Sequence, residues 1–205
     1  MKNIAIIGFG NVGQNLASLF SNAGYQVFIC STQGTIGRPN YQATNFKQGI
    51  EHADAIALAI PYTAVRDVLE PYTQALTDKI IIDCTNPLNE DWSPLLLGQQ
   101  TSAAEQIASF LSSTKVIKAF NTIFADVMPQ QHHDRGGLTM TAFVSGDDLE
   151  AKQEVLNLAE RIGLAPLDTG KLSSARYLEA MAHLNIRIAV EQGGGTQAAF
   201  VYHQG

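Results

Sequence analysis

The first 32 residues constrain the fold of this chain more than any other stretch. The apolar, β-branched run Ile4 to Ile7 predicts a strand, and it ends in the sequence Gly8-Phe9-Gly10-Asn11-Val12-Gly13. Residues 14–23 then predict a helix, and residues 25–30 predict a second strand. This order of strand, G-x-G-x-x-G, helix and strand is the dinucleotide-binding fingerprint in its expected context.

Each glycine of the motif has a physical role in that context. Gly8 allows a sharp turn out of the strand, Gly10 allows close approach of the backbone to a pyrophosphate, and Gly13 allows tight packing of helix on strand. The free N–H groups and the dipole at the helix start then hold the phosphate charge. The alternative is a glycine-rich turn that binds nothing, which the flanking strand and helix make the weaker interpretation.

The end of the second predicted strand indicates which dinucleotide binds. An NAD-binding chain usually carries Asp or Glu there, which accepts hydrogen bonds from the ribose. Here Cys30 is followed by Ser31 and Thr32, with no carboxylate before Glu51, and Arg38 lies in the next loop. Hydroxyls and an arginine suit a 2′-phosphate, so NADP is favoured over NAD. Arg38 as a simple solvated loop residue stays an open alternative.

Length and composition limit the class of protein. The 205 residues suffice for one full domain and a small appendage. A net charge of −6, with no basic cluster, argues against a nucleic-acid or anionic-membrane partner. Met1 leads directly into a core strand and no apolar run reaches the length of a membrane span, so we expect no signal peptide and a cytoplasmic protein.

The cysteines and histidines do not form a metal-binding pattern. Cys30 and Cys84 lie at the ends of apolar strands without C-x-x-C spacing, which predicts buried, reduced thiols. His132 and His133 are adjacent in a polar loop, not at a chelating helical spacing, and are expected to be a surface pair. No metal site is therefore predicted.

Short apolar strands alternate with helices along the rest of the chain. The expected strands are residues 55–60, 79–84, 115–120, 141–145 and 165–168, and the expected helices are residues 62–69, 102–111, 149–162 and 177–192. This alternation predicts an α/β Rossmann fold, a doubly wound, mostly parallel sheet with a short helical C-terminal extension. We assign residues 1–170 to the nucleotide-binding domain and residues 171–205 to the extension that completes a substrate crevice.

Ligands of such sheets bind beyond the carboxyl ends of the strands. Those ends supply one crevice lined by Gly8 to Gly13, Ser31-Thr32, Ile60-Pro61-Tyr62, Thr85-Asn86-Pro87 and Phe120-Asn121-Thr122. These residues are mostly amides, hydroxyls and prolines, which orient a ligand but carry protons poorly. Hydride transfer between two redox rings needs little more than stacking and distance, whereas carbonyl reduction usually needs a positioned acid. We therefore favour ring-to-ring hydride transfer and assign no catalytic residue.

From Ile4 to about Phe200, the chain resembles the NADP oxidoreductases that depend on the deazaflavin coenzyme F420. That family also includes the cytosolic reductase domain of the STEAP ferric reductases. The resemblance is carried by the glycine motif and by the segments Ala59-Ile60-Pro61, Asp83-Cys84-Thr85-Asn86-Pro87-Leu88, Lys118-Ala119-Phe120-Asn121-Thr122, Ser145-Gly146-Asp147-Asp148 and residues 167–176.

The resemblance implies that NADP(H) lies across the carboxyl edge, with a flavin or deazaflavin as second substrate. By that analogy Phe9, Asn11 and Val12 contact the pyrophosphate with the glycines, and Ser31 and Thr32 contact the 2′-phosphate. The remaining implied contacts are Ile60 and Pro61 along the path to the nicotinamide, and Asn121 and Thr122 flanking it. Asn86, at another strand end of the crevice, is also assigned to cofactor binding. The second ring would enter near Leu172 to Arg176.

Two departures from the archaeal pattern bear on the substrate. Archaeal members carry Ser-Arg after the second strand and His-Thr after the later one, where this chain has Ser31-Thr32 and Asn121-Thr122. The missing arginine leaves Arg38 as its substitute. The Asn form resembles the bacterial and STEAP-like branch, so the family name does not by itself establish the deazaflavin as acceptor.

Simpler interpretations stand beside the functional ones. Asn121-Thr122 is also a natural strand-end cap, Asp147-Asp148 is expected to cap the helix starting near Leu149, and Arg176 with Glu179 is expected to be a solvated pair. His183 is expected to be a surface or packing residue.

Two other functions remain open. One is a reductase of the β-hydroxyacid or imine type, although only about 35 residues follow Gly170, too few for the long second domain of that class. The other is a non-catalytic dinucleotide-binding redox sensor. The last helix packs on the sheet or forms a homodimer, and the sequence does not choose between these.

Overall fold

The computed structural model describes residues 1–31 and 41–204. Within them, one sheet has the strand order β3-β2-β1-β4-β5-β6-β7-β8. The strands are β1 (Asn3–Ile7), β2 (Gln26–Cys30), β3 (Gln42–Thr44), β4 (Ala55–Leu58), β5 (Ile80–Asp83), β6 (Lys115–Lys118), β7 (Thr141–Gly146) and β8 (Ala165–Asp168). Every neighbouring pair is parallel except β6 and β7. The predicted Rossmann-like, mostly parallel α/β fold is confirmed.

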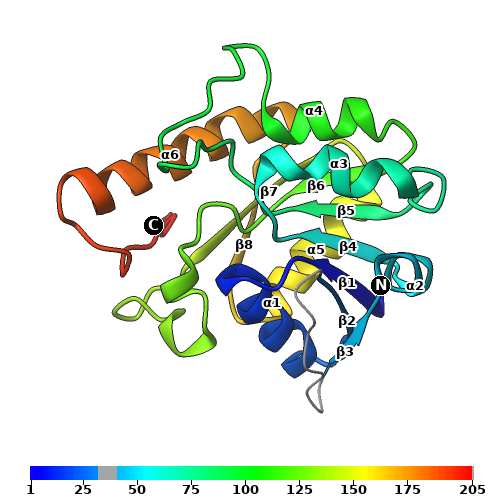
Figure 1. Ribbon diagram of the computed structural model, residues 1–205. Helices are drawn as coiled ribbons and strands as arrows, with labels where there is room; N and C mark the ends of the chain where they lie inside the picture. Colours follow the sequence, from blue (N-terminus) through cyan, green and yellow to red (C-terminus); the bar gives the residue numbers. More distant parts are fainter. Residues whose placement is uncertain (32–40, 205) are drawn as a thin grey trace.

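The central strands are buried on both faces, which explains their unbroken apolar runs. In β1, the side chains of Ile4 and Ile6 enter one core, while those of Ala5 and Ile7 enter the other. Helices cover both cores, with α1 and α5 on one face and α2, α3 and α4 on the opposite face (Figure 1). Because β1, β4, β5 and β6 are parallel, their carboxyl ends share one edge of the sheet.

Local capping explains where several helices begin. The helices are α1 (Asn11–Asn22), α2 (Phe46–His52), α3 (Val65–Leu69), α4 (Ala103–Phe110), α5 (Leu149–Arg161) and α6 (Ala175–Glu191). The Asp148 side chain caps α5 by accepting a hydrogen bond from the Ala151 N–H at 2.8 Å, as predicted, and Ser102 caps α4 in the same way. The short 3₁₀ helices are η1 (Tyr62–Ala64), η2 (Glu70–Tyr72), η3 (Ala125–Val127), η4 (Gln130–His132) and η5 (Leu172–Ser174).

Three features differ from the prediction. The polar stretch before residue 55 contains a strand, β3, and a helix, α2, that the apolar pattern did not indicate. The helix expected over residues 62–69 is divided into η1 and α3, and the last helix begins at Ala175 instead of Tyr177. Short segments of this kind bury few side chains, so hydrophobic periodicity is a weak guide to them.

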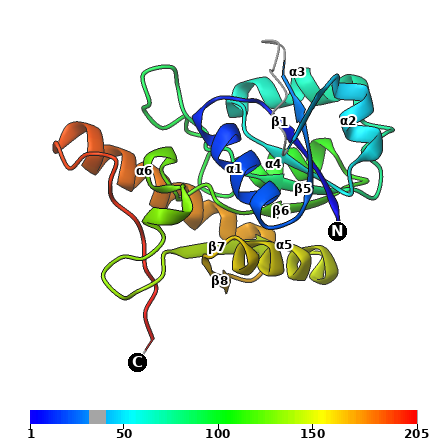
Figure 2. The ribbon, with the colours of Figure 1, turned by 90° about the horizontal axis from the view of Figure 1, so that it is seen from below.

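Helix α6 packs on α4 and η5, burying Leu178, Ala182 and Ile186. Beyond it, the chain returns along β7, where the Thr141 N–H donates to the Phe200 carbonyl at 3.1 Å (Figure 2). The Tyr202 N–H in turn donates to the Thr141 hydroxyl. Of the helices in the described residues, none is both long and apolar enough to cross a membrane.

Candidate functional site

The three motif glycines have different surroundings. Gly8 has φ +102°, and a Cβ there would lie 2.3 Å from the Ala59 carbonyl oxygen. A Cβ on Gly13 would lie 2.3 Å from the Gly8 carbonyl oxygen, because α1 packs directly on the turn. Gly10, with φ −71°, has no atom within 4 Å of its Cβ position. The first and third glycines are needed by the fold itself, whereas the open space at Gly10 fits an approaching ligand.

The start of α1 favours an anion. Gly10 is its N-cap residue and offers no side chain to the first-turn N–H groups, and the first turn contains no acidic residue. Uncapped N–H groups and the positive end of the helix dipole are the usual elements of a phosphate site. Asn11 is exposed there and Val12 is half-buried against the core.

Of the other proposed contacts in the first half, Ile60 lies beside this turn. The Ala59 N–H donates to the Ile7 carbonyl at 2.8 Å, and the Ile60 side chain lies next to Gly8 and is followed by Pro61. The Phe9 ring packs edge-on against Tyr41, with centroids 5.7 Å apart. Ser31 directly follows β2, and Thr32 and Arg38 lie outside the described residues.

Two amides meet where β5 and β6 end. Asn86 Nδ2 donates to the Asn121 carbonyl at 2.8 Å, and Asn121 Nδ2 donates to Asn86 Oδ1 at 2.9 Å and to the Leu178 carbonyl at 3.1 Å. Asn121 is 6% exposed, and its Oδ1 and the Thr85 hydroxyl have no hydrogen-bond partner among the described residues. Unpaired buried oxygens are costly unless a ligand or water completes them. Both oxygens lie where β5 and β6 end, at the edge where ligands of such sheets bind.

The backbone at Phe120, just before Asn121, has an unusual conformation. Phe120 has φ +64°, a left-handed conformation that costs a bulky residue on the order of 1–3 kcal/mol. Its side chain is 2% exposed in the core, while the next residues, Asn121 and Thr122, are brought to the sheet edge and are also buried. Such strain is found preferentially at ligand sites.

Beneath the amides lies a buried ionic cluster that the sequence analysis missed. Lys118 Nζ donates to Asp83 Oδ2 and Glu179 Oε1, both at 2.9 Å, and to the Thr85 carbonyl at 2.5 Å. Burial alone would lower the pKa of Lys118, but the two carboxylates outweigh it and raise that pKa. Asp83 and Lys118 are aligned in the β5–β6 register. Asp83 and Lys118 each end a short strand whose two preceding residues are apolar, and this pattern of opposite charges could have indicated the cluster.

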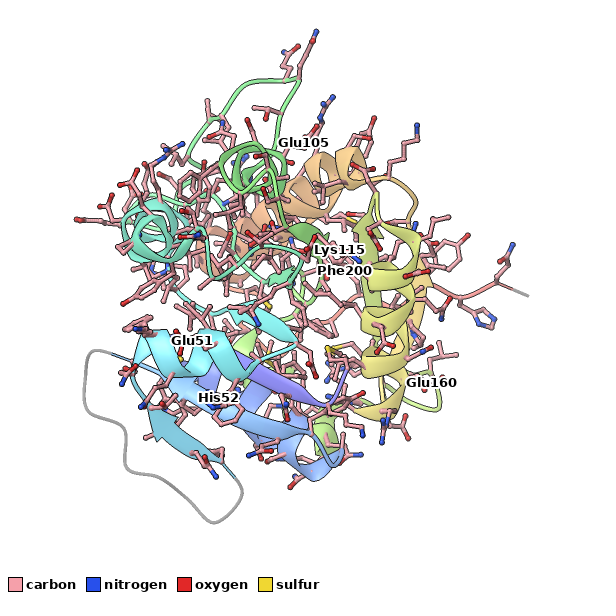
Figure 3. The ribbon with its side chains drawn as sticks, turned by 90° about the vertical axis from the view of Figure 1, so that its right-hand side faces the viewer. Glu51, His52, Glu105, Lys115, Glu160 and Phe200 are labelled. Atoms are coloured by element: carbon pink, nitrogen blue, oxygen red, sulfur yellow. The ribbon has the colours of Figure 1, made fainter. Side chains whose placement is uncertain are left out.

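The structure corrects two smaller predictions. Arg176 and Glu179 are not a solvated pair, because Arg176 forms a bidentate ion pair with Glu105 and Glu179 is 4% exposed. Glu105 is on α4 (Figure 3). His133 is not at the surface, because its ring nitrogens lie 2.8 and 3.2 Å from the Met128 and Gly163 carbonyls. Arg176 and His133 both bind groups distant in the sequence, and the local spacing of residues does not predict such partners.

The two cysteines are buried and unpaired, as predicted. Burial raises the pKa of the Cys30 thiol to about 12 and raises the Cys84 pKa as well, so neither is a ready nucleophile. In the part of the chain that the structure describes, no group of three His, Cys, Asp or Glu side chains is placed to hold a metal ion.

Comparison with known proteins finds similar NADP-linked oxidoreductases. Residues 3–87 match the family model described as NADP oxidoreductase, coenzyme F420-dependent. An F420-dependent NADP reductase of Methanothermobacter thermautotrophicus is 29% identical over 220 residues, which cover 95% of this chain and 93% of the relative. Over nearly its whole length, this chain is similar to the F420-dependent NADP oxidoreductases. The resemblance carried by its motifs is thereby confirmed.

Two further proteins are similar to this chain. The metalloreductase STEAP3 of Rattus norvegicus is 30% identical over 181 residues, covering 87% of this chain. The chain spans only 36% of that relative's length. The structure of a candidate F420-dependent NADP reductase from Arthrobacter sp. FB24 has a TM-score of 0.88, with 26% identity and all of both chains covered. The family fold, including α6, thus extends over the whole described chain.

Proposed function

We propose that this protein binds NADP(H) across the carboxyl edge of the sheet and transfers hydride between the nicotinamide and a flavin-like or deazaflavin ring. The supporting observation is a pair of unfilled polar groups on one edge. The uncapped start of α1 faces the open space at Gly10, and the unpaired Asn121 oxygen lies at the end of β6. A dinucleotide has its pyrophosphate and its carboxamide as the two complementary groups.

The contacts proposed from the sequence fit this orientation. From β1 the chain adds β2 and β3 on one side and then β4 on the other, so the strand order reverses at β1. The pyrophosphate of such folds binds at this switch point. Gly8 to Gly13 would hold the pyrophosphate, with Ile60, Pro61 and Asn86 along the path to Asn121 and Thr122. Ser31, Thr32 and Arg38 remain the proposed contacts of the 2′-phosphate. Since no acidic side chain directly follows β2, repulsion of that phosphate is avoided.

The side chains around the crevice orient groups more than they carry protons. Lys118 is fully buried in its ion pairs, and the Tyr62 hydroxyl donates to Gln106 at 2.6 Å. Burial lowers the pKa of His183, whose Nε2 lies 3.1 Å from the Pro87 carbonyl. NADPH itself supplies the hydride, and a ring acceptor needs no strong acid in the protein. This favours a ring acceptor over a carbonyl substrate.

The acceptor class follows from chemistry and family together. Relatives are named F420-dependent NADP reductases and metalloreductases, so a deazaflavin, a flavin and a ferric chelate are the acceptors to compare. We propose that the ring enters beside α6, near Leu172 to Arg176.

The same helix supports a proposed homodimer. Tyr177, Leu184 and Ile188 are exposed and spaced to lie on one face of α6. A second copy would bury that face. Light scattering after size exclusion tests this, because a dimer mass should fall to that of the monomer in Leu184→Glu, and a monomeric wild-type protein would contradict it.

The experiment for the proposed function uses the purified protein without oxygen. NADPH absorbance is followed after separate additions of F420, FMN and a ferric chelate, each with a protein-free control. We expect protein-dependent oxidation with F420 or FMN. NADPH binding without oxidation by any of the three acceptors would contradict hydride transfer and favour the redox-sensor alternative.

A further inference from the structure

The Lys118 cluster joins helix α6 to two neighbouring strands of the sheet. Asp83 is on β5, Lys118 is on β6 and Glu179 is on α6, and the exposed fraction of the Lys118 and Asp83 side chains is 0%. The Asp83 carboxylate also accepts the Thr85 N–H at 2.9 Å. Burying these charges costs desolvation free energy, and that cost is offset only when the ion pairs and the additional hydrogen bonds are all formed.

Glu179 carries the contact onward to α4. Its carboxylate accepts the N–H groups of Ala103 and Ala104 at 2.9 and 3.2 Å. These are first-turn donors of α4, so the positive end of that helix also stabilises the negative charge. One lysine faces two carboxylates in the cluster, and the start of α4 offsets the excess negative charge. The position of α6 is therefore fixed at Glu179.

The residue before Glu179 contacts the candidate nicotinamide site. The Leu178 carbonyl accepts one Asn121 Nδ2 hydrogen, and Asn86 Oδ1 accepts the other. With both amide hydrogens engaged, the unpaired Asn121 oxygen has a single orientation. A small shift of α6 at Glu179 would move the Leu178 carbonyl and release the amide.

We propose that Glu179, held by Lys118, is a positioning residue that orients the Asn121 amide through the Leu178 carbonyl and so sets the affinity for the nicotinamide end of the cofactor. The inference rests on the proposed function. It assigns to a buried charge cluster a role in ligand recognition in addition to folding.

The test compares two ligands that differ at the nicotinamide end. NADPH and adenosine 2′,5′-bisphosphate, which lacks the nicotinamide, are titrated calorimetrically into the wild type and Glu179→Gln. The matched control is Glu191→Gln, at the exposed end of the same helix, where Glu191 pairs with Arg187. We expect Glu179→Gln to weaken NADPH binding about five- to tenfold, the value of one hydrogen bond, with adenosine bisphosphate unchanged. Glu191→Gln should leave both affinities unchanged.

A second comparison separates positioning from general destabilisation. Asn121→Ser should show the same ligand-selective loss, and adding Glu179→Gln to it should cost no further NADPH affinity, because both changes remove one interaction. If Glu179→Gln does not fold, the neutral and nearly isosteric variant Asp83→Asn/Lys118→Met/Glu179→Gln is used and must show the same selective loss.

Several results would overturn the inference. Equal losses for the two ligands, no loss for NADPH, or additive losses in the double variant would each show that Glu179 does not act through Asn121. A wild-type protein that binds neither ligand would contradict the proposed function, and this inference with it. Binding of the bisphosphate but not NADPH would overturn the nicotinamide site alone.

Discussion

Gly10 and Gly13 belong to one motif but differ in the space around their Cβ positions. A side chain at Gly13 would collide with the Gly8 carbonyl, whereas one at Gly10 would enter open space. The role of each glycine was predictable because the motif fixes the turn geometry. The surroundings separate a glycine required for folding from one required for binding, and mutation can test that separation.

We expect Gly10→Ala to change the free energy of unfolding by less than about 1 kcal/mol, since φ −71° suits alanine. Its NADPH affinity should fall more than about tenfold, because the methyl group occupies the approach to the backbone. Gly13→Ala should instead lose about 2–3 kcal/mol of stability through overpacking. Urea unfolding and NADPH titration check both variants, and equal stability losses would contradict the assignment.

Ser31 allows a test of the 2′-phosphate site. In Ser31→Glu, the added carboxylate should repel that phosphate, so NADPH affinity should fall by about tenfold or more while NADH affinity changes less than about twofold. Ser31→Gln, of the same size but neutral, is the control and should affect both cofactors weakly. Similar losses of NADPH and NADH affinity in Ser31→Glu would show that the phosphate lies elsewhere.

At the scale of elements, the long apolar strands were predictable and the contacts between helices were not. Strands β1, β4, β5 and β6 are buried on both faces, which leaves a strong apolar signal. Helix α2 was missed although Asn45 caps it by accepting the Gln48 N–H, a pattern visible in the sequence. The partners of Arg176 and Glu179 depend on how α4 and α6 pack, and no local pattern contains that information.

The ion pair between α4 and α6 predicts a pH-dependent stability. The side-chain hydrogen bonds from Arg176 lower the pKa of Glu105 below its usual value. The stabilisation is therefore complete above the unfolded-state pKa, roughly 4.3, and is lost as the pH falls through the folded-state pKa. Arg176→Met should lower the urea midpoint at pH 7, and the difference from wild type should shrink below about pH 4.

The matched control for this pair is Arg187→Met, which removes the exposed pair with Glu191 on the same helix. Its urea midpoint should stay close to that of the wild type, because exposed pairs contribute little. High salt should also reduce the Arg176→Met difference. A difference that persists at low pH would point to lost packing of the arginine stem instead of the ion pair.

At the scale of the whole molecule, the division into residues 1–170 and 171–205 remains a proposal. The fold class and strand directions followed from the alternation of strands and helices, since parallel strands need helical crossovers. The ion pair that holds α6 against the sheet did not, because it depends on Lys118 meeting Glu179 across 61 positions of the chain. We propose that the two parts form one cooperative unit.

A truncated chain tests that unit. A chain ending at Gly170 would leave the Ala103 and Ala104 N–H groups without Glu179 and expose the surface that Leu178 covers. We expect it to lose more than about 3 kcal/mol and its cooperative unfolding, measured by circular dichroism in urea. A chain ending at Glu191 retains α6 and should unfold cooperatively. Cooperative, stable folding of the shorter chain would establish residues 1–170 as an independent domain.

The most direct test of NADP binding at this edge is a crystal structure of the protein with NADP bound. We expect the pyrophosphate at the start of α1, over Gly10, with the Asn11 and Val12 N–H groups donating to it. We also expect the carboxamide within hydrogen-bond distance of the Asn121 oxygen and the 2′-phosphate next to Ser31. A cofactor bound elsewhere, or with its nicotinamide turned away from Asn121, would contradict the account.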